Sequence, residues 1–299
     1  FKEIFSAIDK DARWWSSFTC LRYSALALTT MEGSASSLGK QLWSTAEDLR
    51  RGGGWTSPVS GSIRFLIAST LMRHGQSTDR FFSEVERTRQ FFRDAKLPRG
   101  RGNEMLATLV LQAQAEDTGI GRVQRKQVRR LQQVFLQMKA DHPWLTGPDD
   151  YPRAALLADG NHSLRQISVR VEALYQGLRG FRFSQGNALQ TVSHLLFLHP
   201  EADHRILRRF QNLYQAFKGQ GLRMREGDYD EIACLTYLDN STSEIVDCVV
   251  RHRKTIASLG RWVGKNETFS LACHTSFLQL IGNAHHLQWL VDLVSVIQV

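Results

Sequence analysis

Two stretches of the chain align with each other and decide the expected fold: GSIRFLIASTLMRHGQSTDRFFSEVERTRQFFRDAKL at residues 61–97 and GNALQTVSHLLFLHPEADHRILRRFQNLYQAFKGQGL at residues 186–222. At this offset of 125 residues, apolar positions fall on apolar positions, as where Phe81 meets Ile206 and Phe92 meets Phe217. Both stretches place apolar residues three and four apart, which is the period of an amphipathic helix. The alignment predicts a repeated helical hairpin whose copies stack into one core.

A slip of one residue extends the alignment, because residues 106–109 then fall on residues 232–235. Six prolines punctuate helical segments, and alternating runs long enough for a sheet are missing. We therefore expect an all-α protein, an α/α array that is solenoid-like or pseudo-twofold and is built from a duplicated multi-helix unit.

The turn-rich residues 141–150 separate the two copies and mark the expected domain boundary. An N-terminal helical half, residues 1–140, would contain the first copy. A C-terminal half, residues 141–299, would contain the second copy and a capping helix near 284–297. The two halves are also compatible with one continuous domain.

Helix starts are indicated by capping residues. Ser57 and Pro58 suit the first turn of a helix at 59–74. Three capping boxes, in which a side chain at the cap and one three residues later bond each other's backbone, are expected at Ser163/Gln166, Asp228/Glu231 and Ser241/Glu244.

Composition fits a globular protein, with 42% hydrophobic and 22% charged residues among 299. Four widely spaced cysteines suggest neither a disulfide framework nor a zinc knuckle. The chain has no apolar run of about 18 residues and no signal-peptide pattern at its start. We expect a cytoplasmic protein with no membrane association.

The net charge of +9 favours anionic partners. The densest basic run, a candidate basic face, comprises Arg122, Arg125, Lys126, Arg129 and Arg130. It is interpreted either as a solvated helix face or as a nucleic-acid surface. The second interpretation is less favoured, because no aromatic residues are interleaved to stack on bases.

The most unusual connection in the chain is DHPWLTGPDDY, residues 141–151. Its candidate functional residues are His142, Trp144, Thr146, Asp149 and Asp150. His142 with the two aspartates could hold a divalent metal or act as an acid or base. In the alternative interpretation an aspartate caps the next helix and Trp144 with Leu145 fills the core.

A second group of polar residues lies on the duplicated helices and could face a groove: Arg64, Gln190, Ser193 and His194. The alternative is that these groups form buried hydrogen bonds between helices. His285 and His286 point about 100° apart on a helix, so they are poorly placed to bind one ion.

Known catalytic signatures are missing. Gly52–Gly54 lacks the following Lys-Ser/Thr of a phosphate loop, and neither a His-Glu-x-x-His nor a Gly-x-Ser-x-Gly motif occurs. The sequence therefore assigns no metal and no cofactor, and it leaves enzymatic activity undecided while favouring a non-catalytic role.

The motif at residues 142–151, with AALLA at 154–158, resembles a family of bacterial helical proteins, chiefly from Firmicutes, whose function is uncharacterised. The segments 57–64 and 186–194 also look like that family, so the resemblance spans roughly residues 40–260. It implies a bacterial origin and an all-helical fold, and it carries no catalytic residue.

Taken together, these features favour a helical-repeat binding or scaffold protein, with a protein partner or a second copy of itself. The first alternative is a metal-dependent or acid/base enzyme that uses His142, Asp149 and Asp150. The second alternative is nucleic-acid binding through residues 122–130.

Overall fold

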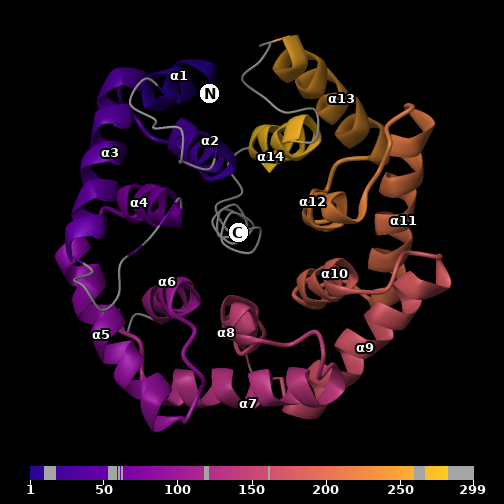
Figure 1. Ribbon diagram of the computed structural model, residues 1–299. Coiled ribbons are helices and arrows are strands. Elements are labelled where there is room, and N and C mark those ends of the chain that lie inside the picture. Colours follow the sequence, from indigo (N-terminus) through magenta and orange to yellow (C-terminus); the bar gives the residue numbers. More distant parts are fainter. Residues whose placement is uncertain are drawn as a thin grey trace. The chain divides into compact units, whose positions relative to one another are not determined.

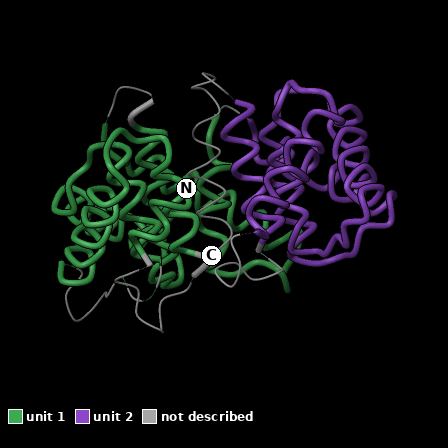
Figure 2. The backbone as a smooth tube through the Cα atoms, turned by 90° about the horizontal axis from the view of Figure 1, so that it is seen from above, with its two compact units in different colours: residues 1–160, 295–299 green, residues 161–294 purple. Residues whose placement is uncertain are grey.

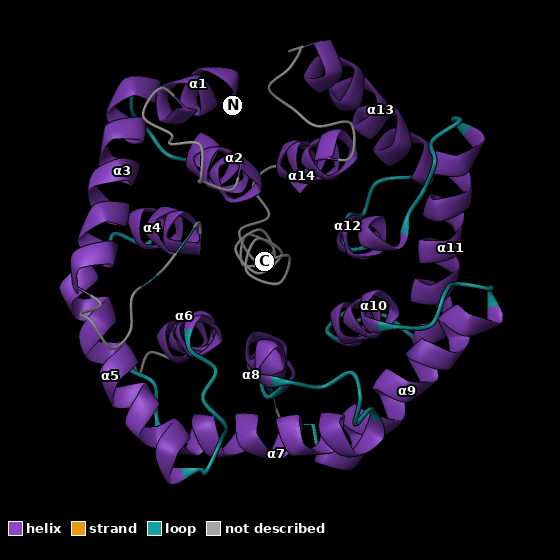
Figure 3. Ribbon diagram, in the orientation of Figure 1, coloured by secondary structure: helices purple, strands orange, loops and turns teal. Residues whose placement is uncertain are grey.

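The structure is a computed structural model. It describes residues 1–9, 18–52, 59, 61, 63–117, 121–160, 162–258 and 267–281. Every regular element within these ranges is a helix (Figure 1 and Figure 3). The predicted all-α fold class is confirmed. The proposed cap at Ser57–Pro58, His285–His286 and the expected C-terminal capping helix fall outside the described residues.

The described α-helices follow one another through short connections. In chain order they are α1 (Lys2–Asp9), α2 (Phe18–Ala27), α3 (Ala35–Gly52), α4 (Ile63–Arg73), α5 (Thr78–Asp94), α6 (Gly102–Asp117), α7 (Arg125–Asp141), α8 (Tyr151–Leu157), α9 (Leu164–Gly180), α10 (Asn187–Phe197), α11 (Asp203–Gly219), α12 (Tyr229–Leu235), α13 (Thr242–Ser258) and α14 (Glu267–Ile281). Three 3-10 turns, η1 (Leu28–Thr30), η2 (Pro148–Asp150) and η3 (Glu226–Asp228), complete the described elements.

The chain forms two compact units, which Figure 2 colours separately. Unit 1 contains the described residues of 1–160, and unit 2 those of 161–294. The division into an N-terminal half, residues 1–140, and a C-terminal half, residues 141–299, stays a prediction.

Unit 1 has two layers of helices. The odd-numbered helices α1, α3, α5 and α7 pack in sequence, each against the next. The even-numbered helices form the second layer, in which α2 packs on α4 and α6 packs on α8. Each odd-numbered helix also contacts the even-numbered helix that follows it. In Figure 1 α3, α5 and α7 are seen lengthwise and α4, α6 and α8 nearly end-on, so the two layers cross steeply.

Unit 2 repeats this plan. Its odd-numbered helices α9, α11 and α13 pack in sequence, and so do α10, α12 and α14. The pairs α9/α10, α11/α12 and α13/α14 join the layers. Because the strongest packing connects neighbours in the sequence, each unit has the contact pattern of a stacked helical array.

The helix bounds repeat with the hairpin. The helices α7, α9, α11 and α13 are each 17 residues long. They begin at residues 125, 164, 203 and 242, which are 39 residues apart. The 125-residue offset seen in the sequence carries α5 onto α11, three hairpins later. Duplication of a larger unit therefore stays a prediction, since a hairpin repeat already relates these helices.

Several helices end in the same backbone motif, in which a residue with positive φ is followed by an apolar residue whose N–H bonds back into the helix. After α5 the two residues are Lys96 (φ 53°) and Leu97, whose N–H donates to the Phe92 carbonyl at 3.1 Å. After α11 they are Gly221 (φ 75°) and Leu222, which donates to Phe217 at 3.2 Å. This is the Schellman motif, and its apolar residue turns the chain back onto the core.

Two of the three predicted capping boxes are confirmed. Gln166 N–H donates to Ser163 Oγ at 3.2 Å, and Ser163 N–H donates to Gln166 Oε1 at 2.7 Å. Ser241 and Glu244 exchange the same pair of bonds at the start of α13. The box at Asp228/Glu231 is wrong: Asp228 accepts from the Arg225 N–H at 2.7 Å, whereas Glu231 is buried.

The core of each unit is apolar and tightly packed. In unit 1 one continuous cluster joins α1 to α6 and includes Leu42, Phe65 and Phe81. In unit 2 Phe183 packs edge-on against Phe210, Tyr214 and Tyr229, with ring centroids 4.7 to 5.2 Å away. Such edge-to-face geometry is favoured between aromatic rings.

Candidate functional site

The connection between α7 and α8 is anchored at both ends. At its start the His142 N–H donates to the Met138 carbonyl at 2.8 Å and ends α7. Buried Thr146 then donates its hydroxyl to the same carbonyl at 3.2 Å. These bonds fix the path of the backbone on either side of Trp144, which lies between the two residues in sequence.

Trp144 is 95% exposed. The expectation that it fills the core is therefore wrong, and Leu145 is only half-buried. A fixed connection that leaves a large apolar side chain in solvent gains little folding energy from it. Packing in the core therefore does not explain why the chain has a tryptophan at position 144.

Asp149 and Asp150 have different surroundings. Asp149 is exposed, whereas Asp150 is completely buried. Asp150 Oδ2 accepts from the Gly147 N–H at 2.8 Å, and its Oδ1 lies 2.8 Å from Arg153 Nη2. Burial raises the pKa of Asp150, and Arg153 with the Gly147 N–H opposes that shift. Asp150 is at the N-cap of α8, but its carboxylate closes the preceding 3-10 turn.

Tyr151 ties the connection to the core of unit 1. Its buried ring packs against Phe92 and Phe135, with centroids 5.3 and 4.9 Å away, and its hydroxyl donates to the Pro98 carbonyl at 2.7 Å. Gly100 lies directly against the ring, since a Cβ there would be 2.7 Å from ring carbons of Tyr151. The second half of the motif therefore has a structural role.

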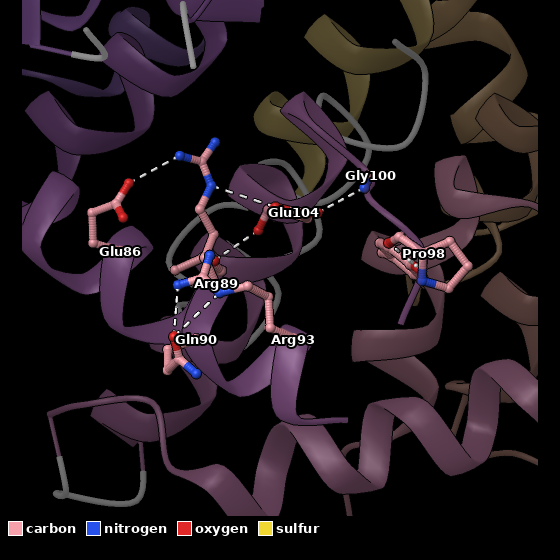
Figure 4. A network of polar contacts seen from close by, with 9 residues as sticks. Glu86, Arg89, Gln90, Arg93, Pro98, Gly100 and Glu104 are labelled. Carbon is pink, nitrogen blue, oxygen red and sulfur yellow. Dashed lines mark hydrogen bonds and ion pairs between the residues drawn. The ribbon is translucent and has the colours of Figure 1, made fainter. Parts of the chain in front are cut away.

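A polar network continues from this point, as Figure 4 shows. Glu104 Oε1 accepts from the Gly100 N–H at 2.7 Å, and Arg89 Nε lies 3.4 Å from Glu104 Oε2. Arg89 also pairs with Glu86 at 3.0 Å. Arg89 and Glu104, which join α5 and α6, are mostly buried, whereas the side chain of Glu86 is exposed. The pair Arg89/Glu104 therefore has the arrangement of a structural ion pair.

No metal-binding group emerges from the described ranges: nowhere in them do three or more His, Cys, Asp or Glu side chains gather as ligands would. His142, Asp149 and Asp150 accordingly do not form such a set.

The candidate groove residues lie in both units. Arg64, on α4 in unit 1, places its guanidinium 5.0 Å from the centroid of the Phe65 ring. Gln190, Ser193 and His194 lie on α10 in unit 2 and are all buried. Ser193 donates its hydroxyl to the Leu189 carbonyl at 2.8 Å. Buried Gln190 has no hydrogen-bond partner for either amide atom among the described residues.

The residues of the candidate basic face differ in their surroundings. Arg125 pairs with Asp94 at 2.7 Å and lies over the Phe91 ring at 5.2 Å. Arg130 is half-buried. Arg122, Lys126 and Arg129 are exposed.

One cluster of titratable residues escaped the sequence analysis. Glu231 on α12 is buried, and its carboxyl group interacts with Asp230 and with Ser270 of α14. Burial, and then the negative charge of Asp230, raise the pKa of Glu231 well above its usual value. His274 Nδ1 donates to the Ser270 carbonyl at 2.8 Å, and burial lowers the pKa of His274. The adjacent acids Asp230 and Glu231 are the only sign of this cluster in the sequence. The packing of α12 on α14 brings His274 near them, and local sequence patterns do not predict that packing.

All four cysteines are buried and free. Burial raises the pKa of the Cys234 and Cys273 thiols well above the ordinary value, so both stay protonated. Of the helices described, none combines the length and apolarity that a bilayer span requires.

These features define a class of all-helical proteins whose hairpins pack in two layers within each unit. The chain belongs to the family described as "Protein of unknown function (DUF4003)", whose model matches residues 4–283. The expected membership of an uncharacterised bacterial family is confirmed.

A curated relative comes from Bacillus subtilis (strain 168), where it is called "Uncharacterized protein YeaA". It is 28% identical over 204 residues, which cover 66% of this chain and 59% of the relative. The match therefore spans less than two thirds of that relative's length. No solved structure matches the chain.

Proposed function

We propose that this protein is a non-catalytic binding protein that docks a protein partner on the face of unit 1 around Trp144. The observation that carries this proposal is the exposure of Trp144, 95%, within a connection held by buried residues on both sides. Tryptophan is enriched at the centres of protein interfaces because it buries a large area with little loss of conformational entropy.

The repeated hairpins support the same function. Stacked helical hairpins create extended surfaces on which side chains can vary without disturbing the core. The residues that hold the connection, Thr146, Asp150 and Tyr151, point inward and leave its outer side free for contact.

Site-specific photo-crosslinking tests this proposal. Trp144 is replaced by photoreactive benzoylphenylalanine in the full chain, which is expressed and irradiated in its native cells. The matched control places the same analogue at Val169, which is 61% exposed in unit 2. We expect an adduct with another protein from position 144 that excess wild-type chain suppresses. Equal adducts from both positions, or none from position 144, would contradict the proposal.

A second candidate function is acid/base chemistry in unit 2, and it rests on the pair Asp230/Glu231 beside His274. Neighbouring carboxyl groups that share a proton in a buried place occur at catalytic sites and also in structural networks. A thermal-shift screen of small polar metabolites separates the two. If Glu231 is catalytic, we expect a compound that raises the melting temperature of the wild type and has no effect on Glu231→Gln. If no compound raises the melting temperature, the result favours a structural network.

A further inference from the structure

The exposed face of α7 changes its chemistry along its length. Five of its exposed positions follow one another at steps of three and four residues and therefore form one line along the helix, while Arg125, Lys139 and Asp141 are exposed beside this line. This α7 stripe consists of Lys126, Arg129, Gln133, Leu136 and Ala140, all of which are exposed, and it leads toward Trp144 just beyond the end of the helix. The stripe is basic where α7 begins and apolar at Leu136 and Ala140, where exposed Lys139 adds a further cation beside it.

The two cations at the basic end of the stripe, Lys126 and Arg129, form no ion pair with the described residues. Arg125, in contrast, pairs with Asp94. The first turn of α7 also contains no acidic residue. Cations near a helix N-terminus are disfavoured by the helix dipole. These charges therefore weaken the helix slightly, and no ion pair among the described residues compensates for that loss.

The apolar end is equally unusual. Only four large hydrophobic residues of the described chain are exposed, and Leu136 (53%) and Trp144 (95%) are two of them. Leu136 is eight residues before Trp144, and the first five of these steps lie within the last turns of α7. Leu136 thus lies near the C-terminal end of the stripe, and Trp144 follows shortly after that end in the sequence.

We propose that the α7 stripe binds an acidic polypeptide segment that carries a large apolar side chain. The inference rests on the proposed function and adds the chemistry of the partner. Charge complementarity selects this occupant, because the stripe presents cations and contains no acidic residue of its own. A second copy of the chain that docked through the same stripe would place basic residues in contact without opposite charges.

The stripe also sets the spacing of groups in the partner. Lys126 and Leu136 are ten residues apart in α7, which is about 15 Å along the axis at a rise of roughly 1.5 Å per residue. An extended partner would cover this span with about four or five residues, at roughly 3.3 Å each. A duplex nucleic acid fits less well, because its phosphates would use the cations and leave Leu136 and Trp144 without a role.

A peptide-display selection with the full chain as bait tests the inference. Enriched random peptides are synthesised with a fluorescent label, and their affinity is measured by anisotropy. We expect peptides with net negative charge and an aromatic or aliphatic anchor. Lys126→Glu/Arg129→Glu should lower their affinity at least about tenfold, and Trp144→Ala by a similar factor, as for interface hot spots. A peptide with its acids changed to lysine should regain affinity for the Lys126→Glu/Arg129→Glu variant.

Matched controls separate the stripe from general charge and apolarity. Arg205→Glu/Arg208→Glu changes two exposed cations of α11, and Val169→Ser removes an exposed apolar side chain of α9. Neither control should alter peptide affinity by more than about twofold, the range of neutral interface positions. Peptides without negative charge, or affinities unaffected by the stripe variants, would overturn the inference.

Two further results would also overturn it. Binding of a DNA duplex that depends on Lys126 and Arg129 but not on Trp144, with no peptide enriched, would assign the cations to nucleic acid. A dimer of the chain that Trp144→Ala abolishes would assign the apolar end to self-association. If crosslinking from position 144 captures a partner whose binding ignores Lys126 and Arg129, the proposed function stands and the acidic partner does not.

Discussion

The connection that leads into α8 and the connection that leads into α12 share a backbone plan and differ in the side chains they present. Each ends in a 3-10 turn closed by a buried aspartate, which accepts from the Gly147 N–H at 2.8 Å in one case and from the Arg225 N–H at 2.7 Å in the other. Each aspartate is followed by a buried tyrosine that begins a seven-residue helix.

Around this common framework the two connections diverge. The first leaves Trp144 in solvent and pairs Asp150 with Arg153. The second is followed by Asp230 and Glu231, and it buries Glu231 against α14. The shared Asp-Tyr pair therefore supports the fold. The residues beside it determine whether the connection presents an exposed aromatic side chain or buries a pair of acids.

The largest expected effects test the shared framework. Tyr151→Ala removes a completely buried ring and should lower the free energy of unfolding by about 3–5 kcal/mol. Tyr229→Ala should have an effect of the same order, because that ring packs against Phe183 and Tyr214. Urea unfolding followed by circular dichroism measures both. A near-zero change for either tyrosine would show that the two connections do not share this buried support.

The two aspartates should differ in size of effect. Asp150→Ala removes the bond from the Gly147 N–H and leaves Arg153, whose side chain is 14% exposed, without its ion pair, so we expect a loss of about 1–3 kcal/mol. Asp228→Ala removes a single backbone bond at the equivalent place and should cost about 1 kcal/mol. The same urea titrations report both values. A larger loss for Asp228→Ala would contradict the expectation that Asp150 contributes more to stability than Asp228.

A pH dependence should distinguish the second connection. The pKa of Glu231 is higher in the folded protein than its usual value of 4.5, so the folded state binds this proton more tightly than the unfolded state. The contribution of Glu231 to stability is therefore most favourable below the unfolded pKa and is lost as pH rises through the folded pKa.

Glu231→Gln should remove this dependence. His274, whose pKa is lowered, acts in the opposite direction as pH falls, so the informative quantity is the difference in unfolding free energy between wild type and variant. We expect the wild type to lose stability relative to Glu231→Gln as pH is raised. A difference that is constant with pH would mean that Glu231 titrates normally.

The smallest effect on stability is expected at the first connection. Trp144→Ala should change the free energy of unfolding by no more than about 0.5 kcal/mol, as for exposed positions in general. Thermal unfolding of the full chain checks this value. A loss comparable with that of Tyr151→Ala would show that Trp144 is part of the core.

The sequence predicts what local patterns determine. The period of apolar residues predicts the helices, and the boxes at Ser163/Gln166 and Ser241/Glu244 form because both partners lie within one turn. The box at Asp228/Glu231 has the same local pattern and fails, because packing of α12 on α14 buries Glu231. The expectation for Trp144 is wrong because an aromatic side chain is usually buried. Only the path of the connection, which the sequence does not reveal, places this side chain in solvent.

The candidate site shows the same division. The residue types of the connection at 142–150 mark it as unusual, yet its sequence does not separate the structural Asp150 from the exposed Trp144. The alignment of cations and apolar residues on α7 follows from helical spacing, but their exposure depends on which face of α7 packs on α5 and α8.

Fluorine NMR of the full chain labelled with 5-fluorotryptophan measures both the exposure of Trp144 and its contact with a partner, with Trp144→Phe to assign the resonance. We expect the Trp144 signal to have a large solvent isotope shift and to move when an acidic peptide from the selection is added. The signal of Trp43, which is half-buried and donates its Nε1–H to the Ile8 carbonyl, should stay in place. A Trp144 signal without a solvent isotope shift, or one that ignores a bound peptide, would contradict the claim that this residue is an exposed binding anchor.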